Sequence, residues 1–250
     1  MAAAAVCPIC GGTGWKIIER AGLSGAEPCR CAGEARAEAL QEGSGIPPNF
    51  VRATLENFVI PHDNPIAAAR LGRAKILIHG FLREFPATDH PGLLLAGDTG
   101  SGKTHLAVAA LKAIIDKGHQ GIFFDYQNLL DRIRSSYDKT SGSGDREAYN
   151  SAMECDVLLL DDLGSHRVTE WVEDIVTSII TYRYNHKKTL IVTTNLDPKG
   201  TVSYKTEGGT QVSKKSLPEV IGTRASSRLL EMCREVNLFG VEDYRAKHAR

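Results

Sequence analysis

The sequence lacks the features that would place the protein in a membrane or on an export route. It has no apolar run approaching the ~18 residues that a membrane-spanning helix needs. The stretch before Cys7 is too short for the apolar core of a signal peptide. These absences predict a soluble, cytoplasmic protein without a membrane partner.

The sequence also lacks a net charge, because 30 lysines and arginines are balanced by 30 acidic residues. This balance excludes a protein that coats nucleic acid by bulk electrostatic attraction, so any such contact needs a local basic patch. The 250 residues are 42% hydrophobic and 24% charged, which excludes wholesale disorder. A chain of this length and composition predicts one or two globular domains.

Cysteine is scarce, and four of the six cysteines lie within the first 31 residues, namely Cys7, Cys10, Cys29 and Cys31. In a chain without a secretory signal, clustered thiols indicate a metal or redox site rather than disulfides. Four thiolates suit a tetrahedral Zn²⁺ site, and so small a unit could hardly fold without a metal. The second pair is spaced C-x-C rather than C-x-x-C, so another metal or redox site and unliganded thiols stay open as alternatives to zinc.

The rest of the chain alternates short apolar runs with amphipathic segments, which predicts a parallel sheet covered by helices on both faces. Strands are expected at 92–96, 122–125, 157–160, 189–194 and 236–239. Helices are expected at 65–85, 103–117, 126–137, 170–186 and 218–233, with a flexible break at 140–144 followed by a short helix. The expected units are a Cys-rich unit at 1–33, a linker and lead-in helix at 34–90, a core at 91–245 and a tail at 246–250.

The strongest motif is GDTGSGKT at 97–104, which fits the pattern G-x-x-x-x-G-K-[S/T] in full. From the composition of this chain, its chance occurrence is roughly 1%. Its glycines let backbone N–H groups surround phosphate oxygens at the positive end of the next helix. The motif predicts a nucleoside triphosphate, with Lys103 on the β- and γ-phosphates and Thr104 on Mg²⁺. The alternative is a glycine-rich turn that only caps a helix. The predicted nucleotide-binding residues are Gly97, Asp98, Thr99, Gly100, Ser101, Gly102, Lys103, Thr104 and His105.

Polar side chains follow two of the predicted strands. Asp161 and Asp162 end an apolar strand, where Asp161 would hold Mg²⁺ and Asp162 would orient or deprotonate the attacking water. Asn195 ends the strand at 189–194, where its amide could contact both the γ-phosphate and the water. Acidic residues and asparagine are also common in turns, and for Asn195 the two interpretations balance.

Two arginines in the last predicted helix, Arg224 and Arg228, are four residues apart and therefore share one helix face. An arginine given to the γ-phosphate of a neighbouring subunit stabilises the charge of the transition state. The alternative is a solvated face on which Arg228 pairs with Glu231, worth only a few tenths of a kcal/mol. Beside the other motifs, the catalytic interpretation is favoured.

Together these motifs resemble the DnaC-type helicase loader and IstB-type transposition ATPase group of the AAA+ superfamily. The resemblance lies in residues 97–107, 156–164, 190–195, 221–233 and 239–245, with a similar lead-in segment at 46–58. It implies a P-loop NTPase (AAA+) three-layer fold whose 91–245 core is an ATPase, with the Asn195 strand between the other two phosphate-contacting strands. It implies that Asp161 and Asp162 form the second nucleotide motif, Asn195 the first sensor, and Arg228 or Arg224 the arginine finger.

The chain ends too soon after Arg228 for the helical lid of a full AAA+ module, which agrees with this group. The usual second-sensor arginine is then expected to be missing. Self-association or a partner protein is expected to complete the ATP site. Candidate basic stretches for DNA are Arg183 with Lys187 and Lys188, the segment 205–215, and the segment 245–250. A solvated surface explains these stretches equally well.

The resemblance implies an ATPase that uses Mg²⁺ and hydrolyses ATP weakly without DNA or a partner. Its expected role is to help load a replicative helicase onto DNA, and single-stranded DNA is the expected ligand in preference to duplex DNA. The alternatives are a transposition helper that assembles on duplex DNA, or a zinc-bearing adaptor that binds ATP without hydrolysing it. A small-molecule kinase is disfavoured, because no acceptor site or basic lid is evident. The Cys-rich unit departs from the well-known loader, so the resemblance identifies the partner least securely.

Overall fold

The protein is built around one five-stranded sheet. The computed structural model describes residues 7–20, 23–61, 63–87, 89–135, 145–165, 169–200, 203–205 and 211–248. The strand order is β4-β5-β6-β3-β9, and every pair is parallel. The strands are β3 (Gly92–Gly97), β4 (Gly121–Asp125), β5 (Val157–Asp161), β6 (Thr189–Thr194) and β9 (Cys233–Leu238). The Asn195 strand, β6, lies between β3 and β5 as the resemblance implied.

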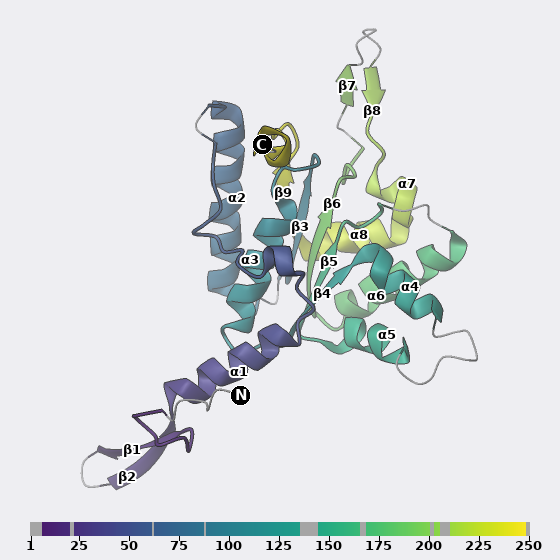
Figure 1. Cartoon of the computed structure of the whole chain (residues 1–250). Helices are drawn as coiled ribbons and strands as arrows, with labels where there is room; N and C mark the ends of the chain where they lie inside the picture. Colours follow the sequence, from purple (N-terminus) through teal and green to yellow (C-terminus); the bar gives the residue numbers. More distant parts are fainter. Residues whose placement is uncertain are drawn as a thin grey trace.

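Helices cover both faces of the sheet and make three layers (Figure 1). One face is covered by α2 (Pro65–Glu84) and α3 (Lys103–Ile115). The other is covered by α4 (Tyr126–Ser135), α5 (Asp145–Glu154), α6 (Glu170–Asn185), α7 (Leu217–Ile221) and α8 (Thr223–Met232). Along β3, Leu93 and Leu95 enter one core and Leu94 the other, because successive side chains point to opposite faces. The predicted α/β class is confirmed.

The predicted last helix is wrong in one respect, because Gly222 divides it into α7 and α8. Gly222 has φ +80°, a conformation that glycine adopts readily, and a Cβ there would lie 2.2 Å from Oε1 of Glu173. A capping box between Ser216 and Glu219 starts α7 separately. β9 begins at Cys233, three residues before the predicted strand. The predicted break at 140–144 lies outside the described residues.

The N-terminal segment forms a hairpin that sequence periodicity did not predict. β1 (Trp15–Arg20) pairs with β2 (Leu23–Pro28) in antiparallel register. α1 (Arg30–Glu42) follows, and Figure 1 shows it leading from the hairpin to the body of the protein. The chain then forms the short helix η1 (Pro48–Phe50) before reaching α2. No helix within the described ranges is long and apolar enough to cross a membrane.

A second hairpin follows β6 and includes most of the candidate basic stretch at 205–215. Its strands are β7 (Ser203–Lys205) and β8 (Gln211–Ser213), and residues 206–210 of this stretch lie outside the described part. Figure 1 shows this hairpin standing out from the body. After α8, the described chain forms only β9 and the five-residue helix α9 (Tyr244–His248). The described residues therefore contain no helical lid.

Candidate functional site

The phosphate loop joins β3 to α3, and Lys103 is the first residue of the helix. Lys103 Nζ donates to the carbonyl oxygens of Gly97 (3.1 Å) and Asp98 (2.7 Å) and to Oδ1 of Asn195 (2.8 Å). Burial lowers the pKa of Lys103 to about 8, although the nearby carboxylates, Asp162 above all, act in the opposite direction. The lysine is thus largely protonated at neutral pH, as phosphate binding requires.

Asp161 and Thr104 come together at the ends of β5 and the phosphate loop. Thr104 Oγ1 donates to Oδ1 of Asp161 at 2.9 Å. Thr193, which the sequence analysis missed, donates to the same oxygen at 2.6 Å, and its hydroxyl accepts from the backbone N–H of Asp162 at 2.9 Å. Burial raises the pKa of Asp161 even though the two hydroxyl groups lower it. A carboxylate beside a hydroxyl group offers the oxygen ligands that Mg²⁺ prefers.

Asn195 connects the lysine to the second carboxylate. Its Nδ2 donates to Oδ1 of Asp162 at 2.7 Å while its Oδ1 accepts from Lys103. These opposite roles fix the orientation of the amide, because only Nδ2 can donate and only Oδ1 can accept. Asp162 has φ +57°, a left-handed conformation that aspartate tolerates better than most residues. The structure therefore places Asn195 at the centre of the predicted set.

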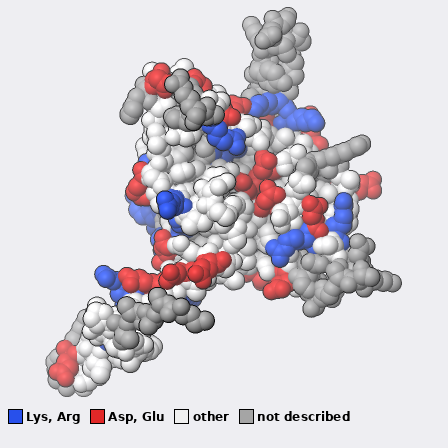
Figure 2. Space-filling view, in the orientation of Figure 1, with Lys and Arg blue, Asp and Glu red and all other residues white. Residues whose placement is uncertain are grey.

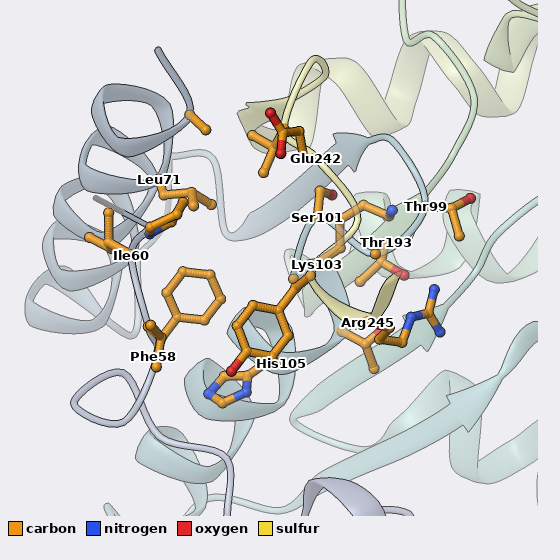
Figure 3. Close-up of a pocket in the computed structure, with 18 of the residues that line it drawn as sticks. Phe58, Ile60, Leu71, Thr99, Ser101, Lys103, His105, Thr193, Glu242 and Arg245 are labelled. Carbon is orange, nitrogen blue, oxygen red and sulfur yellow. The ribbon is translucent and has the colours of Figure 1, made fainter. Parts of the chain in front are cut away.

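A cavity of about 1170 Å³ opens over these residues. Its polar wall includes seven of the predicted nucleotide-binding residues, from Thr99 to His105, together with Asp125, Asp161, Asp162, Thr193 and Asn195. Gly97 and Asp98 are not among the lining residues. The opposite wall is apolar and comes from the lead-in segment and α2, with Phe58, Ile60 and Leu71 facing the loop in Figure 3. The size and the division into polar and apolar walls suit a nucleotide.

His105 attaches the lead-in segment to α3. Its Nε2 lies 2.9 Å from the carbonyl oxygen of Thr54 and 3.0 Å from Oδ1 of Asn57. Its ring meets the ring of Phe58 edge-on, with centroids 5.2 Å apart. Phe58 in turn packs on the loop, where a Cβ at Gly102 would lie only 2.6 Å from its ring. His105 thus positions the apolar wall, a role that its place after the motif did not reveal.

The C-terminal segment adds an arginine to the wall of the cavity. Arg245 lines the cavity, across from Phe58 and Ile60 in Figure 3, and its Nε lies 3.6 Å from Oδ1 of Asp243. The backbone N–H of Tyr244 donates to the carbonyl oxygen of Gly100 at 3.1 Å and holds this segment on the loop. The sequence analysis included Arg245 only in the 239–245 segment and in the basic stretch 245–250, because its place in the cavity depends on how the C-terminal segment folds.

Arg224 and Arg228 lie on α8 and are not among the residues that line the cavity of their own chain. Nη1 of Arg228 donates weakly, at 3.4 Å, to the carbonyl oxygen of Arg224. Glu231 accepts from the hydroxyl group of Tyr184 at 2.7 Å and, within the described part of the chain, forms no ion pair with Arg228. The alternative pairing of Arg228 with Glu231 is therefore not formed, and both arginines stay candidates for a neighbouring subunit.

The cavity fits ATP and Mg²⁺ by the chemistry of its lining. Ser101 Oγ is buried in the phosphate loop without a hydrogen-bond partner among the described residues, which suits an external acceptor such as a phosphate. Lys103 supplies the positive charge, and the start of α3 supplies backbone N–H groups. Thr104 and Asp161 can hold the metal.

The four N-terminal cysteines meet at one place. Their Sγ atoms all lie within 4.8 Å of one another, with Cys7–Cys29 at 3.9 Å and Cys10–Cys31 at 3.4 Å. A tetrahedral Zn–S bond of ~2.3 Å would separate the sulfur atoms by about 3.8 Å. A hydrogen bond from the Cys31 thiol lowers the pKa of Cys10 to about 6, so its thiolate forms readily. The donor set and its spacing fit zinc.

Within the described residues, some members of the candidate basic stretches have partners inside the chain. Arg183 was predicted as an exposed basic residue, but it is fully buried and donates to five backbone carbonyl oxygens around the start of β5 and β6. Lys188 pairs with Glu154. Residues 249–250 lie outside the described residues. Figure 2 shows basic and acidic side chains interspersed on the visible face.

The chain is similar to known proteins in several respects. The family model described as IstB-like ATP binding protein matches residues 85–203. YqaM of Bacillus subtilis (strain 168) is 26% identical over 175 residues, which are 67% of this chain and 54% of that protein. The replicative helicase loader DnaC of Buchnera aphidicola subsp. Baizongia pistaciae (strain Bp) is 23% identical over 163 residues, 63% of this chain and 61% of that protein. The chain thus spans less than two thirds of the length of both relatives.

A solved structure gives a fuller match. The crystal structure of the DnaC helicase loader is 32% identical, with a TM-score of 0.62, and the match covers 77% of this chain and 99% of that chain. Identity at this level across nearly a whole solved chain reflects a shared family as well as a shared fold.

Proposed function

Since the chain belongs to the DnaC-type family of AAA+ proteins with an IstB-like ATP-binding domain, we propose that it is a cytoplasmic ATPase that acts as an assembly switch and helps to load a replicative helicase onto DNA. The observation that carries the proposal is the chain of contacts from Lys103 through Asn195 to Asp162. In these contacts a lysine ammonium, an amide and a carboxylate lie side by side in one cavity, an arrangement that supports nucleotide hydrolysis.

Bound Mg²⁺ would draw charge from the phosphoryl group that is transferred to water. Lys103 and the N–H groups of the loop hold the phosphates, and Thr104 and Asp161 hold the metal. Asp162 is left to orient the attacking water and to accept its proton, while Asn195 keeps that carboxylate in place. Because Asn195 also contacts Lys103, it is the residue that can report whether the γ-phosphate is present.

We propose two further parts of the switch. Arg228 or Arg224 acts on the ATP of a neighbouring subunit, since neither lines the cavity of its own chain. Arg245 lines that cavity and acts on the ATP bound in its own chain. The Cys-rich unit of residues 1–33 binds zinc and contacts the partner protein, at the far end of α1 from the ATPase core of residues 91–245. Exposed apolar side chains on this unit, including Ile17 at 80% and Leu23 at 77%, support a role in protein contact.

The test is loading of a replicative helicase onto closed circular single-stranded DNA, measured as helicase that stays on the circle after gel filtration. We expect ATP-dependent loading by the wild type and none by Asp162→Asn. The Asp174→Asn variant removes an exposed carboxylate of α6, outside the cavity, and is the matched control. Loading that is equal without ATP, or equal in Asp162→Asn, would contradict the proposal.

The second candidate is a transposition helper that assembles on duplex DNA, which the match to the IstB-like family model favours. The two candidates differ in the DNA that stimulates ATP hydrolysis. Stronger stimulation by single-stranded DNA supports the loader, and stronger stimulation by duplex DNA supports the helper. ATP binding without turnover under every condition would support the non-hydrolysing adaptor instead.

A further inference from the structure

The hydroxyl group of Thr193 lies between the two acidic residues of the site. Thr193 belongs to β6, is 1% exposed and lines the cavity (Figure 3). Its Oγ1 donates to Oδ1 of Asp161 at 2.6 Å and accepts from the backbone N–H of Asp162 at 2.9 Å. Because the N–H can only donate, the single proton of the hydroxyl group is directed to the carboxylate. One hydroxyl group therefore contacts both acidic residues in fixed roles.

Thr193 also holds the turn that follows β5. The register of β5 with β6 ends one residue before Thr193. Beyond it, the carbonyl oxygen of Thr193 accepts from the N–H of Leu163 at 2.8 Å, while its side chain accepts from the N–H of Asp162. Asp162 has φ +57° there, a conformation that few residues other than glycine adopt. Thr193 thus holds the backbone of Asp162 in this conformation, whereas Asn195 holds its side chain.

The two oxygens of the Asp161 carboxylate have different surroundings. Oδ1 accepts from Thr193 at 2.6 Å and from Thr104 at 2.9 Å. Oδ2 lies 3.2 Å from Oγ1 of Thr104, and no other group in the described part of the chain donates to it. Thr193 therefore holds Asp161 by Oδ1, which leaves Oδ2 and the hydroxyl oxygen of Thr104 to hold Mg²⁺. Mutation of a residue that hydrogen-bonds a metal-binding carboxylate typically costs roughly 10–100-fold in metal affinity or activity.

The next residue of β6 provides a matched comparison. Thr194 is fully buried, and its Oγ1 donates to the carbonyl oxygen of Leu163 at 2.8 Å and accepts from the N–H of Leu196 at 3.1 Å. Its hydroxyl group thus donates one hydrogen bond and accepts another, as that of Thr193 does. Successive side chains of a strand point to opposite faces, and Thr194 is not among the residues that line the cavity. A valine at either position removes a buried hydroxyl group, but only the hydroxyl group of Thr193 contacts the site.

We propose that Thr193 is a positioning residue that links the metal site to the activation of water, because its one hydroxyl group holds both the carboxylate of Asp161 and the backbone of Asp162. This inference rests on the proposed function, since Asp161 and Asp162 have the roles assigned there. It adds the residue through which the two roles depend on each other. Loss of the hydroxyl group weakens the binding of Mg²⁺ and, separately, slows the chemical step when Mg²⁺ is saturating.

The test measures the Kd of a fluorescent, slowly hydrolysed ATP analogue over a series of Mg²⁺ concentrations and in EDTA, together with kcat at saturating Mg²⁺. Thr193→Val should raise the Mg²⁺ concentration that gives half of the effect on Kd by about tenfold or more, and should lower kcat by about tenfold or more. Its Kd in EDTA should equal that of the wild type, because Lys103 and the phosphate loop are unchanged. Thr193→Ser keeps the hydroxyl group and should keep the wild-type Mg²⁺ requirement and kcat. Added to Asp162→Asn, Thr193→Val should still shift the Mg²⁺ requirement, because this shift depends on Asp161.

The control is Thr194→Val, which should keep the Mg²⁺ requirement and the kcat of the wild type. The proposal would be overturned if Thr193→Val changed only one of these values or neither, or if Thr194→Val changed both to the same extent. Loss of either value in Thr193→Ser would also overturn it, and this result can be obtained even if Thr193→Val does not fold. A wild type that binds the analogue without hydrolysing ATP would instead contradict the proposed function, whereas the Mg²⁺ requirement of Thr193→Val would still test the positioning of Asp161.

Discussion

Replacing Asn195 by alanine separates two tasks that its amide combines. The substitution removes the hydrogen bond to Asp162 and one of three acceptors of Lys103, which keeps the carbonyl oxygens of Gly97 and Asp98. Phosphate binding should therefore survive, while the carboxylate that orients water loses its support. A hydrogen bond to a charged group contributes about 1.5–3 kcal/mol. At ~1.4 kcal/mol per tenfold in rate, kcat should fall between about tenfold and about 150-fold.

Phosphate release gives kcat, and titration with a fluorescent ATP analogue gives Kd. The expected result for Asn195→Ala is the stated loss in kcat with a change in Kd below about threefold. Asn128→Ala removes an exposed amide of α4 outside the cavity and should change neither value. A wild-type kcat in Asn195→Ala would refute the role assigned to the amide. A loss confined to Kd would show that Asn195 serves binding alone.

Three further predictions concern charge, stability and metal. The phosphates of ATP need a protonated Lys103, and the pKa of this lysine is about 8, so the Kd for ATP should rise roughly tenfold between pH 7 and pH 9. Lys103→Arg should remove this pH dependence, and a wild-type Kd that does not change with pH would contradict the role of Lys103. Replacing buried Arg183 by methionine leaves several carbonyl oxygens without a hydrogen-bond donor and should lower the free energy of unfolding by about 3–5 kcal/mol. In thermal unfolding this loss should lower Tm by roughly 6–20 °C, and a change below ~2 °C would refute the structural role of Arg183. Purified protein should release zinc when its thiols are modified, and Cys10→Ser should contain less; a wild type free of zinc would favour another metal or free thiols.

Local sequence was sufficient where one short segment carries the chemistry. The loop at 97–104 and the carboxylates after β5 follow from motifs whose residues are close in the chain, and the structure places them in one cavity. The break at Gly222 was also readable, because a capping box and a glycine mark it. The helical periodicity on both sides of Gly222 outweighed these two features, so one continuous helix was predicted.

Tertiary contacts decided what the sequence could not reveal. Arg183 resembles a surface residue until α6 brings it against the carbonyl oxygens at the start of β5 and β6. Thr193 becomes a partner of Asp161 only because β5 and β6 pair in a given register. Arg245 reaches the cavity because the C-terminal segment folds back over the loop.

We propose above that the cavity hydrolyses ATP with Asp162 as the residue that activates water. The most direct measurement is ATP turnover by the full chain with Mg²⁺ and single-stranded DNA, for the wild type and for Asp162→Asn. Asparagine tolerates the left-handed backbone at this position, so the variant removes charge with little strain. We expect the variant to bind ATP as tightly as the wild type and to lose turnover. Equal turnover by the two proteins would contradict the claim.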